Sequence, residues 1–176
     1  MPPRQKHTSA KTCRAQVPAL HRALLRARVW RSWDTNADIG GGKYELATDE
    51  LAEHQVGNVV YDPYNRPPGF NEASLRVIKK GLMTATVANV LNCIMEPHIR
   101  EKVIRLAAVA VAPKRMAYFA VYEGDKSGVG RETRDGWQEN RKLESYVVEI
   151  EGHFDVVRVV VIEGLRCIVA YGSRLV

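Results

Sequence analysis

Asp38-Ile39-Gly40-Gly41-Gly42-Lys43 is the most informative stretch of this chain of 176 residues. An acid and an apolar residue lead into three glycines, and a helical pattern from Tyr44 to His54 begins directly after them. Glycines at such a junction let the backbone turn tightly and approach a ligand closely. The helix would direct its unpaired N–H groups and its positive dipole end at the same place. The stretch therefore predicts a ligand-binding loop, with a purely structural turn as the alternative.

A second acid favours the ligand-binding interpretation. Val59-Val60-Tyr61-Asp62 is an apolar run that ends in an acid and follows the predicted helix. A strand, a glycine loop, a helix and a second strand that ends in Asp or Glu form one nucleotide-binding half-unit. In that unit the second acid is placed for ribose hydroxyls. We therefore predict a nucleoside-cofactor site.

The type of cofactor follows from the spacing of the glycines. The dinucleotide fingerprint G-x-G-x-x-G fails, because Glu45 occupies its third glycine position. An acid just before the glycines instead resembles the first motif of class I S-adenosylmethionine-dependent methyltransferases. Asn89-Val90-Leu91-Asn92-Cys93-Ile94-Met95-Glu96-Pro97 resembles the fourth strand of that family and the loop after it. The resemblance covers about residues 34 to 172 and is closest to the small single-domain methyltransferases of bacteria and phages.

The resemblance implies an α/β fold: a Rossmann-like sandwich with a mostly parallel sheet and a C-terminal antiparallel hairpin. Two closing runs, Val156 to Ile162 and Cys167 to Tyr171, have the pattern of that hairpin. The apolar run from Thr84 to Leu91 follows the second strand so closely that one strand–helix unit of the family would be missing. Residues 1–33 would form a basic arm and helix, and residues 34–176 the methyltransferase domain.

Further elements follow from hydrophobic periodicity. The helical patterns cover Val17 to Val29, Glu72 to Lys80, Glu96 to Ala112 and Trp137 to Ile150, and a strand covers 116–122. Between this strand and the last of these helices lies a polar, glycine-rich stretch from Glu123 to Arg141. Long polar loops inside compact domains are usually functional or disordered, so we predict a functional lid here.

The resemblance also implies S-adenosylmethionine as the cofactor and two groups of site residues. The implied cofactor-binding residues are Asp38, Gly40, Gly41, Gly42, Asp62, Pro63 and Asn89. The implied catalytic, acceptor-side residues are Asn92, Tyr122 and Glu123. In this pattern the glycines hold the methionine portion, Asp38 supports its ammonium, and Asp62 takes the ribose hydroxyls. If the acceptor must lose a proton, Glu123 is the nearest candidate for a general base; the alternative is a surface carboxylate.

Positive charge is concentrated at the N-terminus. Residues 1–33 carry eight of the 26 basic residues and no acid, which leaves 18 basic against 20 acidic residues in the rest of the chain. Such an arm favours contact with phosphates, so we predict a nucleic acid or nucleotide as the methyl acceptor. The alternatives are an organellar transit peptide, a helix that only caps the sheet, a small-molecule methyltransferase, and a non-catalytic nucleoside-binding partner subunit.

Several classes of protein are disfavoured by composition. The three cysteines, Cys13, Cys93 and Cys167, form no C-x-x-C pair, which argues against a disulfide framework or a zinc site and suits the cytoplasm. The histidines show no metal-ligand spacing. No apolar run is long enough to span a bilayer, so we expect no membrane contact.

Overall fold

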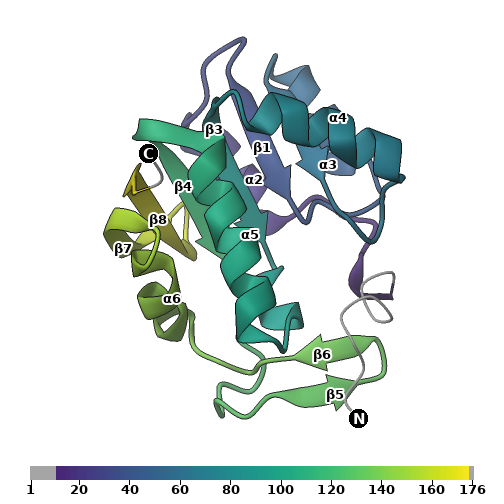
Figure 1. Cartoon of the computed structure of the whole chain (residues 1–176), viewed down its shortest axis with the longest axis vertical. Helices are drawn as coiled ribbons and strands as arrows, with labels where there is room; N and C mark the ends of the chain where they lie inside the picture. Colours follow the sequence, from purple (N-terminus) through teal and green to yellow (C-terminus); the bar gives the residue numbers. More distant parts are fainter. Residues whose placement is uncertain (1–10, 175–176) are drawn as a thin grey trace.

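The computed structural model describes residues 11–174, which are built around a six-stranded sheet in the order β2-β1-β3-β4-β8-β7 (Figure 1). The strands are β1 (Thr35–Ile39), β2 (Gly57–Tyr61), β3 (Leu82–Ala88), β4 (Val111–Ala120), β7 (Phe154–Ile162) and β8 (Leu165–Ser173). The first four are parallel, whereas β8 is antiparallel to β4 and to β7. The predicted α/β fold with a mostly parallel sheet and a terminal antiparallel hairpin is confirmed.

The described part of the sheet has no strand beyond β2. From β2 the chain passes through α4 (Pro68–Ile78) directly to β3, on the other side of β1. This confirms that one strand–helix unit is missing. Because β2 and β3 lie on opposite sides of β1, the carboxyl ends of β1 and β3 form a topological switch point, which is where ligands bind in open α/β sheets.

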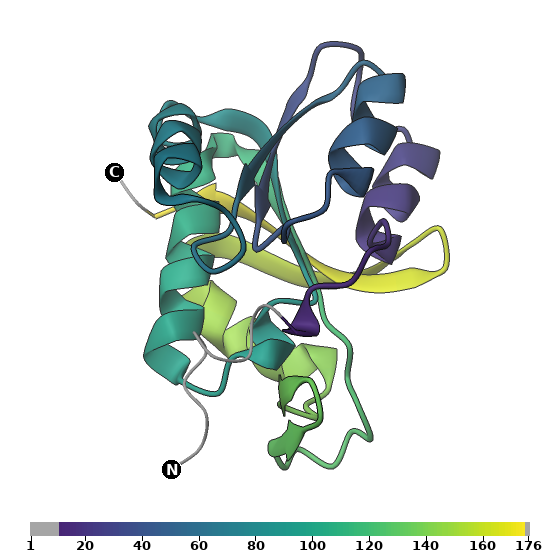
Figure 2. The ribbon, with the colours of Figure 1, turned by 90° about the vertical axis from the view of Figure 1, so that its right-hand side faces the viewer.

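Helices cover both faces of the sheet. α4, α5 (Pro97–Ala110) and α6 (Val147–Glu151) pack on one face, and α2 (Ala19–Arg26) and α3 (Leu46–Glu53) pack on the other (Figure 2). α2 buries its apolar side against the sheet through Leu20 and Leu24. Arg28 has a positive φ of 52° just after α2 ends, and the helix is shorter than the predicted Val17 to Val29.

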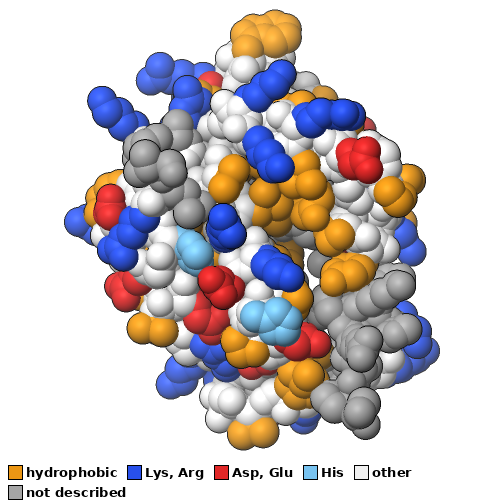
Figure 3. Space-filling model, in the orientation of Figure 1, with side chains coloured by type: hydrophobic (Ala, Val, Ile, Leu, Met, Phe, Trp, Pro, Cys, Tyr) orange, Lys and Arg blue, Asp and Glu red, His pale blue; other side chains and the backbone are white. Residues whose placement is uncertain are grey.

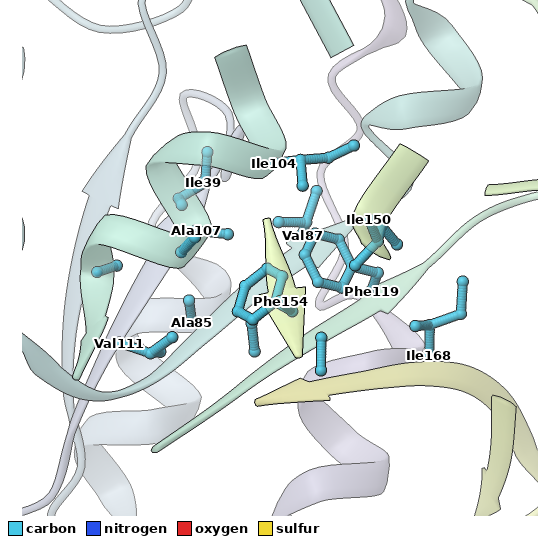
Figure 4. Close-up of a cluster of buried hydrophobic side chains, with 14 of the residues drawn as sticks. Ile39, Ala85, Val87, Ile104, Ala107, Val111, Phe119, Ile150, Phe154 and Ile168 are labelled. Carbon is cyan, nitrogen blue, oxygen red and sulfur yellow. The ribbon is translucent and has the colours of Figure 1, made fainter. Parts of the chain in front are cut away.

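The main core lies under α5 and α6. Ile104 of α5 and Ile150 of α6 lie over Val87 and Phe119 of the central strands (Figure 4). Phe119 also packs edge to face on Phe154, with 6.2 Å between ring centroids. These side chains are fully buried, and burial of a large apolar side chain contributes about 1.5–3 kcal/mol.

The predicted helix from Trp137 onward is wrong at its start. Trp137 lies in β6 (Gly136–Gln138), which pairs with β5 (Arg131–Thr133) in an antiparallel hairpin. Helical structure resumes only at η2 (Leu143–Tyr146), before α6. The reason lies in the backbone: Asn140, inside the predicted helix, has a positive φ of 52°, which does not occur in a right-handed helix.

Other element boundaries shift by a few residues. α3 begins at Leu46 rather than Tyr44, and α5 ends at Ala110. Asn71 lies inside α4 and uses its side chain for the contacts described below. Among residues 11–174, no helix has the length and apolar character needed to cross a bilayer.

Candidate functional site

A cavity of about 1200 Å³ lies where the four parallel strands end. Its lining includes the segments that follow β1, β2, β3 and β4, together with α5 and the β5–β6 hairpin. These are the predicted glycine loop, the loop that begins at Asp62, the loop around Asn92 and the segment after Ala120. Figure 3 shows hydrophobic side chains gathered in the middle of the face that carries α4 and α5. The two segments predicted to bind a nucleoside cofactor, those of Asp38 and Asp62, therefore line the same cavity.

The glycine loop is shaped by its own surroundings. Gly40 and Gly42 have φ values of +77° and +75°, a conformation that favours glycine. A Cβ atom on Gly40 would lie 2.5 Å from Cγ2 of Val90, and one on Gly42 would overlap Sγ of Cys13. On Gly41 it would lie 2.6 Å from Oδ2 of Asp38. Any side chain in this loop would thus collide with the protein itself.

Asp62 connects the loop after β2 to the glycine loop. Its Oδ1 accepts the N–H groups of Tyr64 and Asn65, each at 3.0 Å. Its Oδ2 accepts the N–H of Gly42 at 3.0 Å and the side-chain N–H of Asn65 at 3.1 Å. Four donors fill the lone-pair sites of a carboxylate. A ribose hydroxyl would therefore have to replace one of them, and the Asn65 side chain is the one that is free to rotate.

Two residues that the sequence analysis missed reinforce this connection. Asn71 accepts the Asp62 N–H at 2.9 Å and donates to the Asp62 carbonyl oxygen at 2.9 Å, which fixes the backbone there. Nε of Arg66 donates to the Gly42 carbonyl oxygen at 2.6 Å, and its guanidinium pairs with Glu45. The hydrogen bond from Arg66 is the main reason that the pKa of Glu45 is lowered. An arginine so placed could have been recognised only from contacts across 24 positions of sequence.

Asp38 has a different position from that of Asp62. In β1 the polar residues alternate with apolar ones, so Asp38 points away from the main core toward α2 and α3. It is 2% exposed, and His21 of α2 lies 3.5 Å from its Oδ2. Thr86 and Asn58 donate to its two oxygens at 3.4 Å each. It nevertheless reaches the cavity lining beside the glycine loop.

Asn92, predicted on the acceptor side, is held in the cavity lining by a chain of amide hydrogen bonds. Nε2 of Gln138 donates to the Tyr122 carbonyl oxygen at 2.9 Å, which turns Oε1 of Gln138 toward Asn92. Nδ2 of Asn92 donates to that Oε1 at 3.1 Å. Oδ1 of Asn92 is left buried and without a partner among the described residues. Gln138 was not singled out from the sequence, because β6 had been assigned to a helix.

The structure does not bring all three predicted acceptor-side residues together. Tyr122 is 65% exposed and lines the cavity with Asn92. Glu123 lies outside the cavity lining: its carboxylate accepts the Leu143 N–H at 2.7 Å and pairs with Lys126 and Arg166. The Leu143 hydrogen bond is the main cause of its lowered pKa. A carboxylate with these partners is a weak general base.

The remaining cofactor-side residues are at the rim. Asn89 lines the cavity at the end of β3, where it has a positive φ of 58° and its N–H donates to the Ala120 carbonyl oxygen at 2.8 Å. Pro63 is an exposed part of the lining. No group of three or more His, Cys, Asp or Glu side chains that could hold a metal ion occurs within residues 11–174.

Part of the N-terminal arm lies over the site. Thr12, Cys13, Arg14 and Gln16 belong to the cavity lining. Arg14 lies 3.8 Å from Asp135 of the β5–β6 hairpin, which also belongs to the cavity lining. Arg4 and Lys6, two of the basic residues expected to contact phosphates, lie outside the described residues.

Comparison with known proteins gives a result only at the level of structure. No protein-family model matches the sequence, and no curated protein is similar to it. A solved structure of 1,6-didemethyltoxoflavin-N1-methyltransferase from Burkholderia thailandensis, with 1,6-didemethyltoxoflavin and S-adenosylhomocysteine bound, has a TM-score of 0.58 at 17% identity. The match covers 93% of this chain and 77% of that one.

Two other methyltransferases match over most of both chains. A protein from Methanosarcina mazei described as a S-adenosylmethionine-dependent methyltransferase has a TM-score of 0.58 at 13% identity, with 84% of this chain and 94% of that one covered. CalS10, an amino pentose methyltransferase from Micromonospora echinaspora with S-adenosylmethionine bound, has a TM-score of 0.54 at 11% identity, with 88% and 89% covered. Identities this low establish the fold alone. The chain has the Rossmann-like α/β fold of class I S-adenosylmethionine-dependent methyltransferases, without one strand–helix unit.

Proposed function

We propose that this protein is a S-adenosylmethionine-dependent methyltransferase that acts on a small acceptor molecule. One observation carries the proposal: Gly42 N–H donates to Asp62 Oδ2 at 3.0 Å, so the glycine loop and the second acidic motif form one continuous wall of the cavity. The structurally similar proteins from Burkholderia thailandensis and Micromonospora echinaspora, crystallised with S-adenosylhomocysteine and S-adenosylmethionine, support this choice of cofactor.

The residues present suit such a cofactor. The glycine loop would hold the amino-acid portion, because its backbone can be approached closely where no side chain intervenes. Asp62 would accept a ribose hydroxyl in place of the Asn65 side chain, with Pro63 and Asn89 at the edges of the site. When bound, the cofactor supplies a methyl group on a positively charged sulfur. The protein's task is then to position the two reactants and exclude water.

Asn92 and Tyr122 would position the acceptor. The chain of amide hydrogen bonds through Gln138 fixes the Asn92 side chain, and a fixed polar group positions a substrate better than a mobile one. We do not assign a general base to Glu123, because its carboxylate already has three partners and lies away from the cavity. The acceptor would then be a group that attacks without prior loss of a proton, or one that transfers its proton to water.

The placement of the arm favours a small acceptor. Cys13 contacts the glycine loop at Lys43 and Arg14 lies near Asp135, so this part of the arm occupies one part of the cavity wall and would leave less room for a polymer. Arg22, one of the basic residues on α2, lies near Glu50, at 3.5 Å. The nucleic-acid acceptor stays a prediction: Arg4 and Lys6 lie outside the described residues, whereas Arg26, Arg28 and Arg31 are described and exposed.

Calorimetry with S-adenosylmethionine and S-adenosylhomocysteine tests the cofactor. Binding of both in the micromolar range, at one site per chain, is the expected result, and no binding would refute the proposal. A radiolabelled-methyl assay against separated small metabolites, DNA, RNA and protein then tests the acceptor. Label should enter the metabolite fraction; label found only in DNA or RNA would restore the nucleic-acid interpretation. A chain that binds both ligands yet labels no fraction would be a cofactor-binding partner subunit.

A further inference from the structure

His21 and Asp38 form a buried pair on the face of the sheet that α2 and α3 cover. The exposed fraction is 0% for His21 and 2% for Asp38, and Nε2 of His21 lies 3.5 Å from Oδ2 of Asp38. Burial of a carboxylate is unfavourable unless hydrogen bonds or a positive charge compensate it. Among residues 11–174, His21 is the one basic side chain within ion-pair distance of Asp38.

A chain of hydrogen bonds ends on the same carboxylate. Nε1 of Trp30 donates to Oγ1 of Thr84 at 2.7 Å, and Thr84 donates to Oδ1 of Asn36 at 2.9 Å. Nδ2 of Asn36 donates to Oδ1 of Asn58 at 2.9 Å. Nδ2 of Asn58 then donates to Oδ2 of Asp38 at 3.4 Å. Each group turns its donor toward the next acceptor, so the network directs the side-chain N–H of Asn58 at Asp38.

The His21 ring is oriented for contact with Asp38. Both of its polar contacts are made by Nε2, to Asp38 and to Oγ1 of Thr86 at 3.2 Å, whereas Nδ1 has no partner among the described residues. The ring also stacks on Trp30, with 6.5 Å between centroids and 24° between planes. A histidine needed only to fill space on an apolar helix face would not require this alignment of Nε2.

Asp38 connects this buried pair to the cavity. Asp38 lines it, and the same Oδ2 that faces His21 lies 2.6 Å from the position that a Cβ atom on Gly41 would take. We propose that His21 is a positioning residue for ligand binding: it holds the Asp38 carboxylate against the glycine loop, where the carboxylate binds the ammonium of the cofactor's amino-acid portion. This inference rests on the proposed function, which supplies a ligand with an ammonium group.

Two ligands that differ in the amino-acid portion test this role. S-adenosylhomocysteine carries the ammonium, whereas 5′-methylthioadenosine has the same nucleoside and lacks the amino acid. His21→Phe keeps an aromatic ring beside Trp30 and removes Nε2. By calorimetry, its affinity for S-adenosylhomocysteine should fall about tenfold or more, because a charge-assisted contact is lost, while its affinity for 5′-methylthioadenosine stays within about twofold. A purely structural role would weaken both ligands alike.

His21→Gln is the matched control, because the amide nitrogen of glutamine can take the place of Nε2. Its affinity for S-adenosylhomocysteine should return to within about threefold of the parent. A second measurement uses only the parent protein, so it does not depend on whether a variant folds. In parent protein with ¹⁵N-labelled histidine, S-adenosylhomocysteine should shift the Nε2 signal of His21, and 5′-methylthioadenosine should leave it unchanged.

The outcomes separate the inference from the proposed function. If the parent binds neither ligand, the proposed function fails and this inference fails with it. If the parent binds S-adenosylhomocysteine but His21→Phe binds it equally well, or weakens both ligands equally, the inference alone is overturned. If His21→Phe does not fold, the ¹⁵N signal of His21 Nε2 in the parent protein tests the inference instead. The same shift of that signal with both ligands would refute the positioning role.

Discussion

Sγ of Cys13 accepts the backbone N–H of Lys43 at 3.3 Å, and this contact attaches the N-terminal arm to the glycine loop. Together with the approach of Arg14 to Asp135, it brings the arm into contact with two segments that line the cavity, the glycine loop and the β5–β6 hairpin. Among residues 11–174, Thr12 is the first arm residue in the cavity lining, and two truncations test the contact of Cys13 and the basic residues before it separately.

Deleting residues 1–10 should leave cofactor affinity unchanged, because Cys13 and Arg14 remain. Deleting residues 1–14 should speed cofactor release by removing the contact to Lys43. Stopped-flow measurement of release of S-adenosylhomocysteine checks both. If the arm binds nucleic acid, the shorter deletion should also make the salt dependence of that binding shallower, since Arg4 and Lys6 are lost. Equal release rates for both truncations would show that the Cys13 contact has no effect on access.

Asp62→Ala should weaken S-adenosylmethionine binding at least tenfold. A charge-assisted hydrogen bond contributes about 1.5–3 kcal/mol, and about 1.4 kcal/mol is tenfold in affinity. Asn65→Ala is the control, because it removes one of the four donors on Asp62 and leaves the carboxylate. It should bind the cofactor as tightly as the parent or more tightly, as measured by calorimetry. A loss of affinity in Asn65→Ala as large as that in Asp62→Ala would mean that Asp62 acts only by holding its own loop.

Gly41→Val should lower stability as well as cofactor binding. Its Cβ would lie 2.6 Å from Asp38 Oδ2 and 2.9 Å from Val60 Cγ1, and overpacking of this kind costs about 1–3 kcal/mol. The substitution is therefore a poor probe of ligand space alone. Gly69→Ala is the matched control, because no atom lies within 4 Å of the added Cβ in α4. Urea unfolding should show a lower midpoint for Gly41→Val and an equal or higher one for Gly69→Ala.

Arg100→Met should destabilise the protein by about 1–3 kcal/mol, the usual effect of leaving a buried hydrogen-bonding group without its partner, while Glu149 keeps its ion pair with Arg141. Arg100 is 4% exposed, pairs with Glu149 at 2.8 Å and donates to the Ile94 carbonyl oxygen at 2.8 Å. Arg105→Met, at an exposed position of the same helix, should change the free energy of unfolding by no more than about 0.5 kcal/mol. Similar unfolding curves for the two variants would contradict the structural role of Arg100.

Glu123→Gln should lower stability near neutral pH and leave methyl transfer nearly unchanged. The Leu143 N–H, followed by Lys126 and Arg166, lowers the pKa of Glu123 in the folded protein below its ordinary value of 4.5. The stability that it contributes is therefore present above pH 4.5 and is lost as the pH falls through the lower folded-state pKa. The difference in urea midpoint between parent and variant should shrink below pH 4.5. A loss of activity with unchanged stability would instead identify Glu123 as the base.

Much of the fold could be predicted from local sequence. The glycines after Asp38, the acid after Val60 and the two closing apolar runs fix the order of the elements, because each depends on residues close together in the chain. The missing strand–helix unit was also predictable, since too few residues lie between Asp62 and Leu82 for another unit. The helix from Trp137 was not correctly predicted, because a short polar hairpin has a weak hydrophobic period and depends on the backbone conformation of Gly136 and Asn140.

Local sequence was enough to predict most of the residues that lie where the parallel strands end, because parallel strands bring their carboxyl ends to one edge of the sheet. Glu123 is the exception, since it lies outside the cavity lining. What each of these residues contacts is set by the packing of the tertiary structure. Asp62 bonds to Gly42 and Glu123 to Leu143, both across 20 positions, and His21 reaches Asp38 from a helix on the opposite face from α5. Such contacts depend on how the layers pack, and residue spacing along one strand or helix contains no information about packing between layers.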